Sequence, residues 1–425
     1  MRRDAVTPAE SFFRVFEGVD LAGLVREFGT PLYVMSEDEI IRRIRVVKAC
    51  FDNKYERSGA QFAAKAFISR DMLRILERED VGLDVVSGGE LFLARDMGFP
   101  PWKITFHGNS KSPDEISAAL EYGVGKIVCD SLDEIIMIDE TAGAMNRSAD
   151  VLIRVNPGVE GSTHRHILTS GRTKFGLTPA MVKEAIVLCR KLRNISPSGF
   201  HFHVGSQLMT PETHLAALET VLDLIKDTRD AGFNARVLNM GGGFGVSYID
   251  GDDPAPLEYF VEPMARRVEQ FCRANGIARP DLVIEPGRWI TGPSGITLYT
   301  VCSVKAIPGD TTYVGVDGGY PDNPRPALYE ARYSAVAVGK RDGPVKNTTI
   351  AGKCCESGDI IIRGIMLPEV RCGDVIAVLC TGAYNYSMSN NYNKNPIPAV
   401  VMISGGKPRL SVRRQTYEEI FARDL

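Results

Sequence analysis

Lys65 is the first residue along the chain whose surroundings suit covalent chemistry. It lies in the segment QFAAKAF, between alanine and phenylalanine side chains. Apolar neighbours remove water from an amine, which lowers its pKa and frees it to form a Schiff base with an aldehyde. Taken from its spacing alone, however, the residue is better explained as a lysine that extends from a strand end into solvent. Lys65 is therefore a candidate nucleophile that needs support from other residues.

A run of three glycines, Gly241, Gly242 and Gly243, occurs in the segment VLNMGGGFG. Consecutive glycines let backbone N–H groups converge on an anion. The alternative is a tight turn that needs a positive φ. The triplet follows the seventh of the strands predicted below, and the seventh and eighth loops of a (β/α)₈ barrel often hold phosphate. This placement favours a phosphate site.

Two histidines and a serine stand close together in the segment GFHFHVGSQ. His201 and His203 alternate and so lie on one face of a strand. One of them could be a core histidine bonded to backbone, whereas a ring at the strand end could stack on a planar cofactor. Ser206 follows and could donate a hydrogen bond to a phosphate.

Glu285 begins the segment Glu285-Pro286-Gly287-Arg288. A buried carboxylate beside an arginine is usually a structural ion pair. The functional alternative is a carboxylate that faces a pyridine nitrogen, keeps it protonated and strengthens its pull on electrons. Pro286 and Gly287 would then turn the chain so that Arg288 points into the same site.

The C-terminal third carries further reactive side chains in three segments, DNPRPALY, CCESGD and GAYNYSMSNNYN. Arg325 and Tyr329 stand four residues apart, Cys355 precedes Glu356, and Tyr384 opens a tyrosine-rich stretch. Each segment alone is consistent with a surface loop. Together they supply a guanidinium for a carboxylate, a thiol for proton transfer and phenols for hydrogen bonding.

Eight short apolar runs are expected to position these residues as strands. The runs are Phe62–Ala64, Leu83–Val86, Ile104–Phe106, Ile127–Cys129, Val151–Val155, Gly199–Phe202, Arg236–Met240 and Leu282–Ile284. The residues that directly follow them are Lys65, Ser87, His107, Asp130, Asn156, His203, Gly241 and Glu285. Helix-like stretches separate the runs, which predicts parallel βαβ units and a closed (β/α)₈ TIM-type barrel. The chemistry of such a barrel sits at the C-terminal ends of its strands, where these residues would converge.

A second domain is predicted outside the barrel. After about Arg288, short β-branched runs separated by Gly, Asp and Pro are typical of an antiparallel β domain, a β-sandwich or β-barrel. The runs expected to form its strands include Ile296–Val304, Thr311–Val316, Ile360–Ile365, Val375–Leu379 and Ala399–Ile403. The strand-like segment Pro31–Met35 is expected to join it. The predicted boundaries are 36–288 for the barrel, and 1–35 plus 289–425 for the β domain. The last barrel helix is expected within 257–275, beginning near Pro263.

Length and composition limit the function classes. A chain of 425 residues favours two domains, and 44% hydrophobic with 24% charged residues is ordinary for a globular protein. A net charge of −3 gives no reason to expect nucleic acid or an acidic membrane surface as a partner. Nine cysteines without CxxC spacing suggest neither disulfides nor zinc, so a cytoplasmic location and no metal are expected.

The chain resembles the meso-diaminopimelate decarboxylases, which belong to the alanine-racemase-like (fold type III) enzymes that use pyridoxal 5′-phosphate (PLP). The matching segments are FAAKAF, GLDVVSGGEL, GFPPWKITFHGNSKS, FHVGSQ, NMGGGFG, EPGR, VDGGYPDNPRPALY, CCESGD and TGAYNYSMSNNYN. They run nearly from end to end of the chain, in the order found in the family. The resemblance implies PLP-dependent decarboxylation of meso-2,6-diaminopimelate at its D centre to L-lysine and CO₂, the last step of lysine biosynthesis.

The resemblance also implies roles in binding the cofactor. Lys65 would bind PLP covalently and His203 would stack on its ring. Glu285 would bond the pyridinium nitrogen. Ser206, the triplet Gly241–Gly243 and the turn Pro286-Gly287-Arg288 would hold the phosphate.

For the substrate, the resemblance implies binding by Arg288, Arg325, Tyr329, Glu356 and Tyr384, with Tyr384 also near the cofactor. Cys355 matches the proton donor. In the family, Cys355 and Glu356 reach the PLP of the neighbouring subunit, which implies a homodimer with shared active sites.

One segment departs from the family pattern. The residues before KFG read THRHILTSGRT from Thr163, with His166 where the family has tyrosine and Ser170 where it has glycine. The substrate alternatives are therefore D-lysine, D-ornithine or a carboxylated polyamine. Substrates without a distal carboxylate should dispense with an arginine like Arg325. The CESGD segment disfavours a racemase, and a PLP-binding regulatory protein would be a single barrel without the β domain.

Overall fold

The computed structural model describes residues 7–159, 172–339 and 344–425. The departing loop from Thr163 to Ser170 lies outside the described residues. Two compact units are present: Met1–Arg42 with Val246–Asp253 and Arg288–Leu425, and Arg43–Gly245 with Pro254–Gly287. They differ from the predicted domain ranges mainly because residues 246–253, which fall inside the predicted barrel, group with the β-rich unit.

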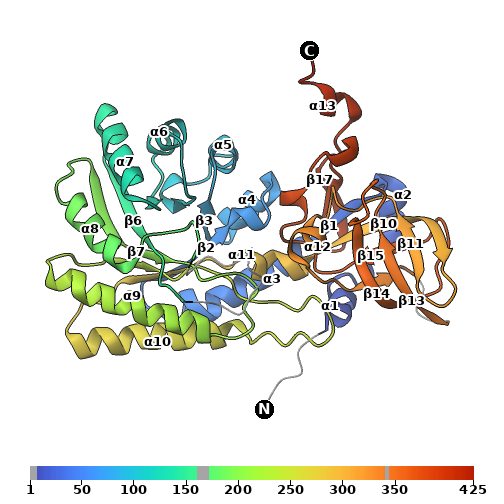
Figure 1. The fold of residues 1–425 in the computed structure, drawn as a ribbon, viewed down its shortest axis with the longest axis horizontal. Coiled ribbons are helices and arrows are strands. Elements are labelled where there is room, and N and C mark those ends of the chain that lie inside the picture. Colours follow the sequence, from blue (N-terminus) through green and yellow to red (C-terminus); the bar gives the residue numbers. More distant parts are fainter. Residues whose placement is uncertain (1–6, 160–171, 340–343) are drawn as a thin grey trace. The chain divides into compact units, whose positions relative to one another are not determined.

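Eight parallel strands close into a barrel in the unit that begins at Arg43 (Figure 1). They are β2 (Ser58–Ala63), β3 (Gly82–Val85), β4 (Ile104–Phe106), β5 (Lys126–Cys129), β6 (Ala149–Val155), β7 (Ile195–Phe202), β8 (Val237–Asn239) and β9 (Asp281–Ile284). Each pairs with its neighbours in chain order, and β9 pairs with β2. This arrangement confirms the predicted (β/α)₈ barrel. The sequence could indicate it because parallel strands buried on both faces are nearly continuous apolar runs.

Seven helices alternate with these strands and lie around them (Figure 1). They are α4 (Arg70–Arg78), α5 (Gly88–Asp96), α6 (Pro113–Tyr122), α7 (Leu132–Ala144), α8 (Pro179–Cys189), α9 (Glu212–Asp230) and α10 (Leu257–Asn275). Helix α3 (Glu37–Val47) precedes the barrel. Ser69, Ser87, Ser112, Ser131 and Thr178 cap α4 to α8, because each side chain accepts a hydrogen bond from a backbone N–H of the first turn.

The expected start of the last barrel helix is wrong. Helix α10 begins at Leu257, and Pro263 lies inside it. Leu257, Phe260 and Val261, all before the proline, are buried. Their burial extends the apolar face toward the N-terminus and offsets the backbone hydrogen bond that the proline cannot make.

The other unit is built on a nine-stranded, mostly antiparallel sheet (Figure 1). Strand β1 (Leu32–Ser36) pairs antiparallel with β10 (Gly295–Ala306) and parallel with β16 (Ala399–Ser404). The expectation that Pro31–Met35 joins the C-terminal sheet is therefore confirmed. The remaining strands are β11 (Thr312–Val316), β12 (Ala335–Ala337), β13 (Val345–Ala351), β14 (Ile360–Pro368), β15 (Val375–Val378) and β17 (Lys407–Val412). Of these, β12, β13 and β17 were not predicted.

Side chains of this sheet contribute to two apolar clusters. Two clusters form because successive residues of a strand point to opposite faces. Leu32 and Val34 pack in a cluster with residues of α1 (Pro8–Val15) and α2 (Leu21–Phe28). Tyr299 and Tyr333 belong to the other cluster. Three short helices, α11 (Gly287–Thr291), α12 (Arg325–Tyr329) and α13 (Tyr417–Phe421), complete the α-helices of the described residues. Among the described residues, no helix combines the length and apolar character that a membrane span requires.

Candidate active site

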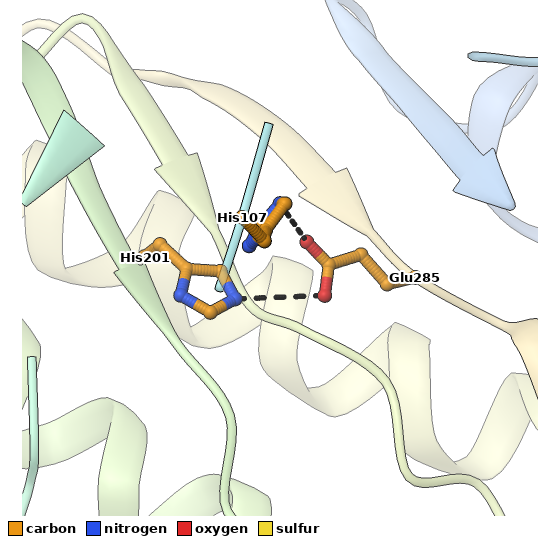
Figure 2. A group of neighbouring side chains, drawn as sticks. All are labelled: His107, His201 and Glu285. Carbon is orange, nitrogen blue, oxygen red and sulfur yellow. Dashed lines mark ion pairs between the residues drawn. The ribbon is translucent and has the colours of Figure 1, made fainter. Parts of the chain in front are cut away.

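Glu285 stands at the C-terminal end of β9 and faces His107 and His201, which come from two other strands of the barrel (Figure 2). Its Oε1 accepts a hydrogen bond from Asn239 Nδ2 at 2.6 Å. The same oxygen lies 3.0 Å from His107 Nε2, at the end of β4. Its Oε2 lies 3.5 Å from His201 Nε2, within β7. The carboxylate is therefore held between an amide and two imidazoles.

The charge state of Glu285 follows from these neighbours. Burial acts to raise the pKa of Glu285, but His107 and His201 outweigh burial and hold that pKa well below its usual value. Burial lowers the pKa of His201 to about 3, so this ring is neutral at neutral pH. Glu285 is thus a buried carboxylate that stays ionised, a state that requires compensating partners.

Asp84 and Arg154 add charge around this group. Asp84 Oδ1 lies 3.7 Å from His107 Nε2, and burial raises the pKa of Asp84 to about 6. Arg154 Nη1 lies 3.5 Å from Asp130 Oδ1, and its guanidinium stacks 4.4 Å from the Phe175 ring centroid. Asp130 also accepts a hydrogen bond from the backbone N–H of Gly176 at 3.1 Å, and so connects the end of β5 to the segment after β6.

Lys65 lies on a short 3₁₀ turn, Ala64–Ala66, directly after β2 ends at Ala63. The predicted strand thus ends one residue too late, and the lysine is placed by a turn instead of extending from a strand. Its positive charge acts on Asp84, Glu90 and His203: it favours the ionised carboxylates and opposes protonation of the imidazole. Lys65 therefore belongs to the same rim as Glu285.

The glycine triplet forms a turn that no other residue could adopt. Gly241 has a φ of +66° and Gly243 a φ of +98°. A Cβ on Gly242 would lie 2.1 Å from the backbone oxygen of Glu285, and one on Gly243 would lie 2.2 Å from that of Gly205. A side chain at either position would collide with neighbouring backbone, so the turn requires glycine.

His203 and Asn239 connect this turn to the carboxylate site. The backbone N–H of Gly242 donates to His203 Nδ1 at 3.1 Å. Burial lowers the pKa of His203 well below its usual value, so the ring is neutral. Asn239 Oδ1 accepts from the backbone N–H of Gly241 at 2.9 Å, while its amide donates to Glu285. Ser206 follows three residues after His203.

The turn after Glu285 packs against the lysine turn. A Cβ on Gly287 would lie 2.9 Å from Ala63 Cβ and 3.1 Å from Ala66 Cβ, so only glycine fits there. The rim therefore combines an amine, an ionised carboxylate, a neutral imidazole and a glycine-lined turn.

A separate cluster in the β-rich unit contains two buried arginines. Arg288 Nη1 donates to Tyr248 Oη at 2.5 Å, and its guanidinium lies 4.5 Å from the Tyr384 ring centroid. Arg325 Nη1 donates to Tyr333 Oη at 2.5 Å and to Tyr248 Oη at 3.4 Å. Burial acts to lower the pKa of Arg325, but these two phenols outweigh it and raise that pKa. Buried guanidiniums among phenols suit a carboxylate ligand.

The other residues predicted to bind the substrate belong to the β-rich unit, C-terminal to the barrel strands. Tyr329 ends α12, and Tyr384 has a φ of +64°, which is unusual for a tyrosine. Cys355 and Glu356 are exposed in the single chain, on the turn between β13 and β14. The backbone N–H of Cys355 donates to Asn393 Oδ1 at 3.1 Å.

Several residues of both clusters were missed as site candidates. Asp84 and Arg154 carry charge inside the apolar runs GLDVV and VLIRV, and a charged residue within a buried strand is a signal that could have found them. Asn239 also lies within a predicted strand. Tyr248 and Tyr333 lie in loops with no distinguishing pattern.

His214 gives a testable pH dependence of stability. Its Nε2 lies 2.9 Å from the backbone oxygen of Gly242, and burial lowers its pKa from 6.5 to about 4. Between these values the unfolded chain binds a proton that the folded chain does not, so stability is lost as the pH falls. His214→Gln keeps an amide donor but cannot titrate. We expect urea unfolding to show that the variant loses about 2 kcal/mol less than wild type between about pH 7 and about pH 5. Equal losses would contradict this role.

Comparison with known proteins gives consistent matches. Residues 37–292 match the family described as "Pyridoxal-dependent decarboxylase, pyridoxal binding domain". The diaminopimelate decarboxylase of Bacillus subtilis (strain 168) is 44% identical over 413 residues, covering 96% of this chain and 94% of that protein. That of Staphylococcus aureus (strain COL) is 40% identical over 412 residues, covering 96% of each. The crystal structure of diaminopimelate decarboxylase from M. jannaschii in co-complex with L-lysine has a TM-score of 0.90 at 33% identity, covering 96% of this chain and 95% of that one.

Proposed function

The chain belongs to the diaminopimelate decarboxylase family of pyridoxal-dependent enzymes, and from this membership we propose which of its residues carry out the reaction. It is a PLP-dependent decarboxylase. Its proposed substrate is meso-2,6-diaminopimelate, from which it would remove the carboxylate at the D centre to give L-lysine and CO₂. The observation that carries the proposal is a buried, ionised glutamate on the same barrel rim as Lys65 and a glycine-lined turn.

The barrel rim fits PLP on three counts. The turn of Gly241–Gly243 follows β8, the seventh strand of the barrel, and the seventh and eighth loops of such barrels often hold phosphate. Both ring nitrogens of His201 are buried without a hydrogen bond to any described residue, which suits a site completed by a polar ligand. The donor set pairs an amine for the aldehyde with a carboxylate for the pyridine nitrogen.

PLP, when bound, supplies an electron sink for the pair that the departing carboxylate leaves behind. In the proposal, Lys65 binds the aldehyde carbon and Glu285 holds a proton on the pyridine nitrogen. The neutral ring of His203 stacks on the cofactor without adding charge. Ser206, the glycine triplet and the turn Pro286-Gly287-Arg288 bind the phosphate.

Substrate selection is assigned to the arginine cluster. Arg325 and Arg288 would bind the carboxylate at the distal L centre, with Tyr329, Glu356 and Tyr384 contributing hydrogen bonds. A buried guanidinium left without its carboxylate is costly. This cost favours diaminopimelate over D-lysine, D-ornithine or another substrate that lacks a distal carboxylate.

Arg325→Lys tests the substrate assignment. Lysine keeps the charge but loses the planar pair of donors that a carboxylate prefers. We expect KM for meso-diaminopimelate to rise roughly 100-fold with a smaller change in kcat. Arg332→Gln, on an exposed residue of the same segment, is the matched control and should leave both constants unchanged. An unchanged KM in Arg325→Lys would exclude this arginine from substrate binding.

The proposal includes a homodimer in which Cys355 and Glu356 act at the partner's PLP, with Cys355 returning the proton to the decarboxylated carbon. Exposure of both residues in the single chain supports this role. A cytoplasmic location is also proposed, because nine cysteines without CxxC spacing suit a reducing compartment.

Subunit mixing tests the shared site. Lys65→Ala and Cys355→Ala homodimers should each be nearly inactive. Exchange between them would create heterodimers with one intact pair of Lys65 and Cys355, so part of the activity should return. Exchange is verified by native mass spectrometry of the mixture. If heterodimers form and activity does not return, the shared-site proposal is wrong.

A further inference from the structure

We propose that His107 is a positioning residue that keeps Glu285 ionised and oriented toward the pyridine nitrogen of the cofactor. The inference rests on the proposed function, because it assigns to His107 a role in the cofactor site. His107 does not carry out a step itself. It acts through the carboxylate that it contacts.

The Nε2 atom of His107 lies at ion-pair distance from two buried carboxylates, of which Figure 2 shows Glu285. This atom lies 3.0 Å from Glu285 Oε1 and 3.7 Å from Asp84 Oδ1. The relative exposures are 3% for His107, 6% for Glu285 and 1% for Asp84, so water does not share these contacts. The backbone N–H of His107 donates to the carbonyl of Val85 at 2.7 Å, which anchors the residue at the strand end.

The other neighbours of Glu285 cannot replace this contact. His201 meets the second oxygen at 3.5 Å, and its ring packs edge-on against His107 with centroids 4.6 Å apart. Its ring is neutral, since burial lowers its pKa to about 3. Asn239 donates one hydrogen bond but carries no charge. The charged or titratable groups that face this site are Lys65, Asp84, Arg154, His107, His201 and His203.

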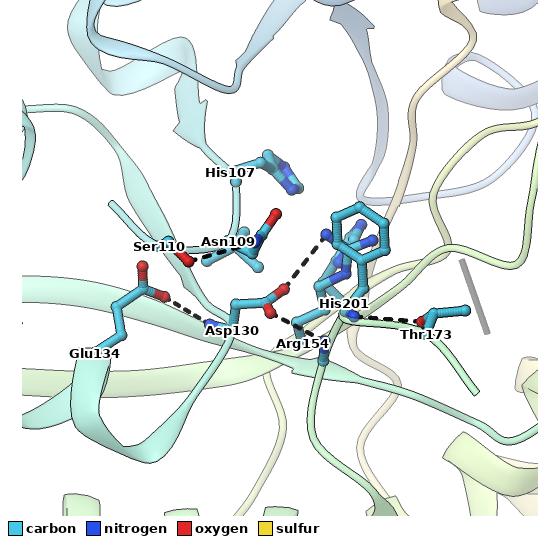
Figure 3. A network of polar contacts seen from close by, with 12 residues as sticks. His107, Asn109, Ser110, Asp130, Glu134, Arg154, Thr173 and His201 are labelled. Carbon is cyan, nitrogen blue, oxygen red and sulfur yellow. Dashed lines mark hydrogen bonds and ion pairs between the residues drawn. The ribbon is translucent and has the colours of Figure 1, made fainter. Parts of the chain in front are cut away.

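Arg154 is the strongest competing source of positive charge. It lies at ion-pair distance from Asp130 (Figure 3). Its guanidinium also stacks on Phe175. Its charge is therefore shared with a carboxylate of its own. Of the two imidazoles that contact the carboxylate of Glu285, that of His107 lies nearer.

Loss of His107 should leave the pyridine nitrogen of the cofactor without its proton. Burial acts to raise the pKa of Glu285, and without His107 fewer groups oppose this rise. The carboxylate would therefore gain a proton more readily. A protonated Glu285 would donate to the pyridine nitrogen instead of accepting from it. The nitrogen would then lose its proton and the ring would withdraw electrons less strongly.

The experiment compares wild type, His107→Gln, His107→Leu and Thr105→Val. Glutamine keeps an amide donor of similar reach, and leucine removes the donor. Thr105 lies two residues earlier on the same strand, is buried, and accepts from Gln61 Nε2 at 2.8 Å, so its valine variant removes an interior hydrogen bond away from Glu285. Each apoprotein is titrated with PLP for its Kd, and nitrogen-15 NMR of labelled PLP reports the protonation of the pyridine nitrogen.

We expect His107→Leu to bind PLP roughly 10- to 100-fold more weakly and to hold an unprotonated pyridine nitrogen at neutral pH. His107→Gln, which keeps a polar amide but not the titratable ring, should fall between wild type and His107→Leu, and Thr105→Val should match wild type on both readouts. Should His107→Leu not fold, His107→Asn, whose amide is too short to reach Glu285, is expected to give the same two changes. A protonated nitrogen and a Kd within about threefold of wild type in the folded variant would overturn the inference. Failure of the wild-type protein to bind PLP would overturn the proposed function itself.

Discussion

Lys65→Ala is expected to abolish covalent attachment of PLP and to lower kcat by at least roughly 10³-fold. The alanine variant retains the carboxylate and the glycine turn, so it should still bind PLP weakly and without a covalent bond. Borohydride reduction of wild type followed by proteolysis should recover the cofactor on the peptide that contains Lys65. The same treatment of Lys65→Ala should recover no labelled peptide.

Lys111→Met is the matched control for a buried lysine of the same barrel. Lys111 Nζ donates to the carbonyls of Gly108 and Val128 and lies 3.0 Å from Glu134 Oε1, so its contacts are structural. Its loss leaves a buried carboxylate unpaired and should reduce stability by about 3 kcal/mol while cofactor attachment continues. Label on a lysine other than Lys65, or a fully active Lys65→Ala, would contradict the assignment.

Glu285→Gln is expected to lower kcat by roughly 10² to 10³-fold with little loss of folding stability. Glutamine has the same shape and can still accept from Asn239, but it cannot hold a proton on the pyridine nitrogen. Decarboxylation should slow because the cofactor then withdraws electrons less strongly. The measurement is kcat under saturating substrate and PLP, together with the protonation state of the bound cofactor.

Asp84→Asn separates the role of Glu285 from a general effect of charge. Asp84 lies on the same rim, but it faces His107 and burial raises its pKa to about 6. Removing its charge should therefore lower kcat by less than about tenfold. Equal losses in the two variants would mean that net charge matters and that Glu285 has no special position.

The barrel and the polar residues at the ends of its strands could be predicted from the sequence for a physical reason. Strands buried on both faces are uninterrupted apolar runs, and the first polar residue after each run marks the rim. This rule found Lys65, His107, Asp130 and Glu285 without knowledge of the fold. It placed Lys65 one residue too close to its strand, because local spacing does not distinguish a strand end from a 3₁₀ turn.

Other parts of the site depend on contacts between distant segments. Tyr248 and Tyr333 meet the two arginines only after the chain has folded, and neither stands in a distinctive pattern. Asp84 lies inside the apolar run Leu83–Val86 and not directly after it. The rule that selects the first polar residue after each run therefore passes over Asp84. Strands β13 and β17 contain many exposed polar residues and lack the apolar signal that identified the others. Sequence patterns report burial, and they say less about residues whose role is set by long-range pairing.

The most direct measurement is product formation by the purified, PLP-loaded enzyme with meso-diaminopimelate, D-lysine, D-ornithine and L-ornithine as separate substrates. We predict that meso-diaminopimelate releases equal amounts of CO₂ and L-lysine, and that the other three release CO₂ at least roughly 100-fold more slowly. No CO₂ from meso-diaminopimelate, or faster release from D-lysine or an ornithine, would contradict the assignment of this barrel rim and its arginine cluster.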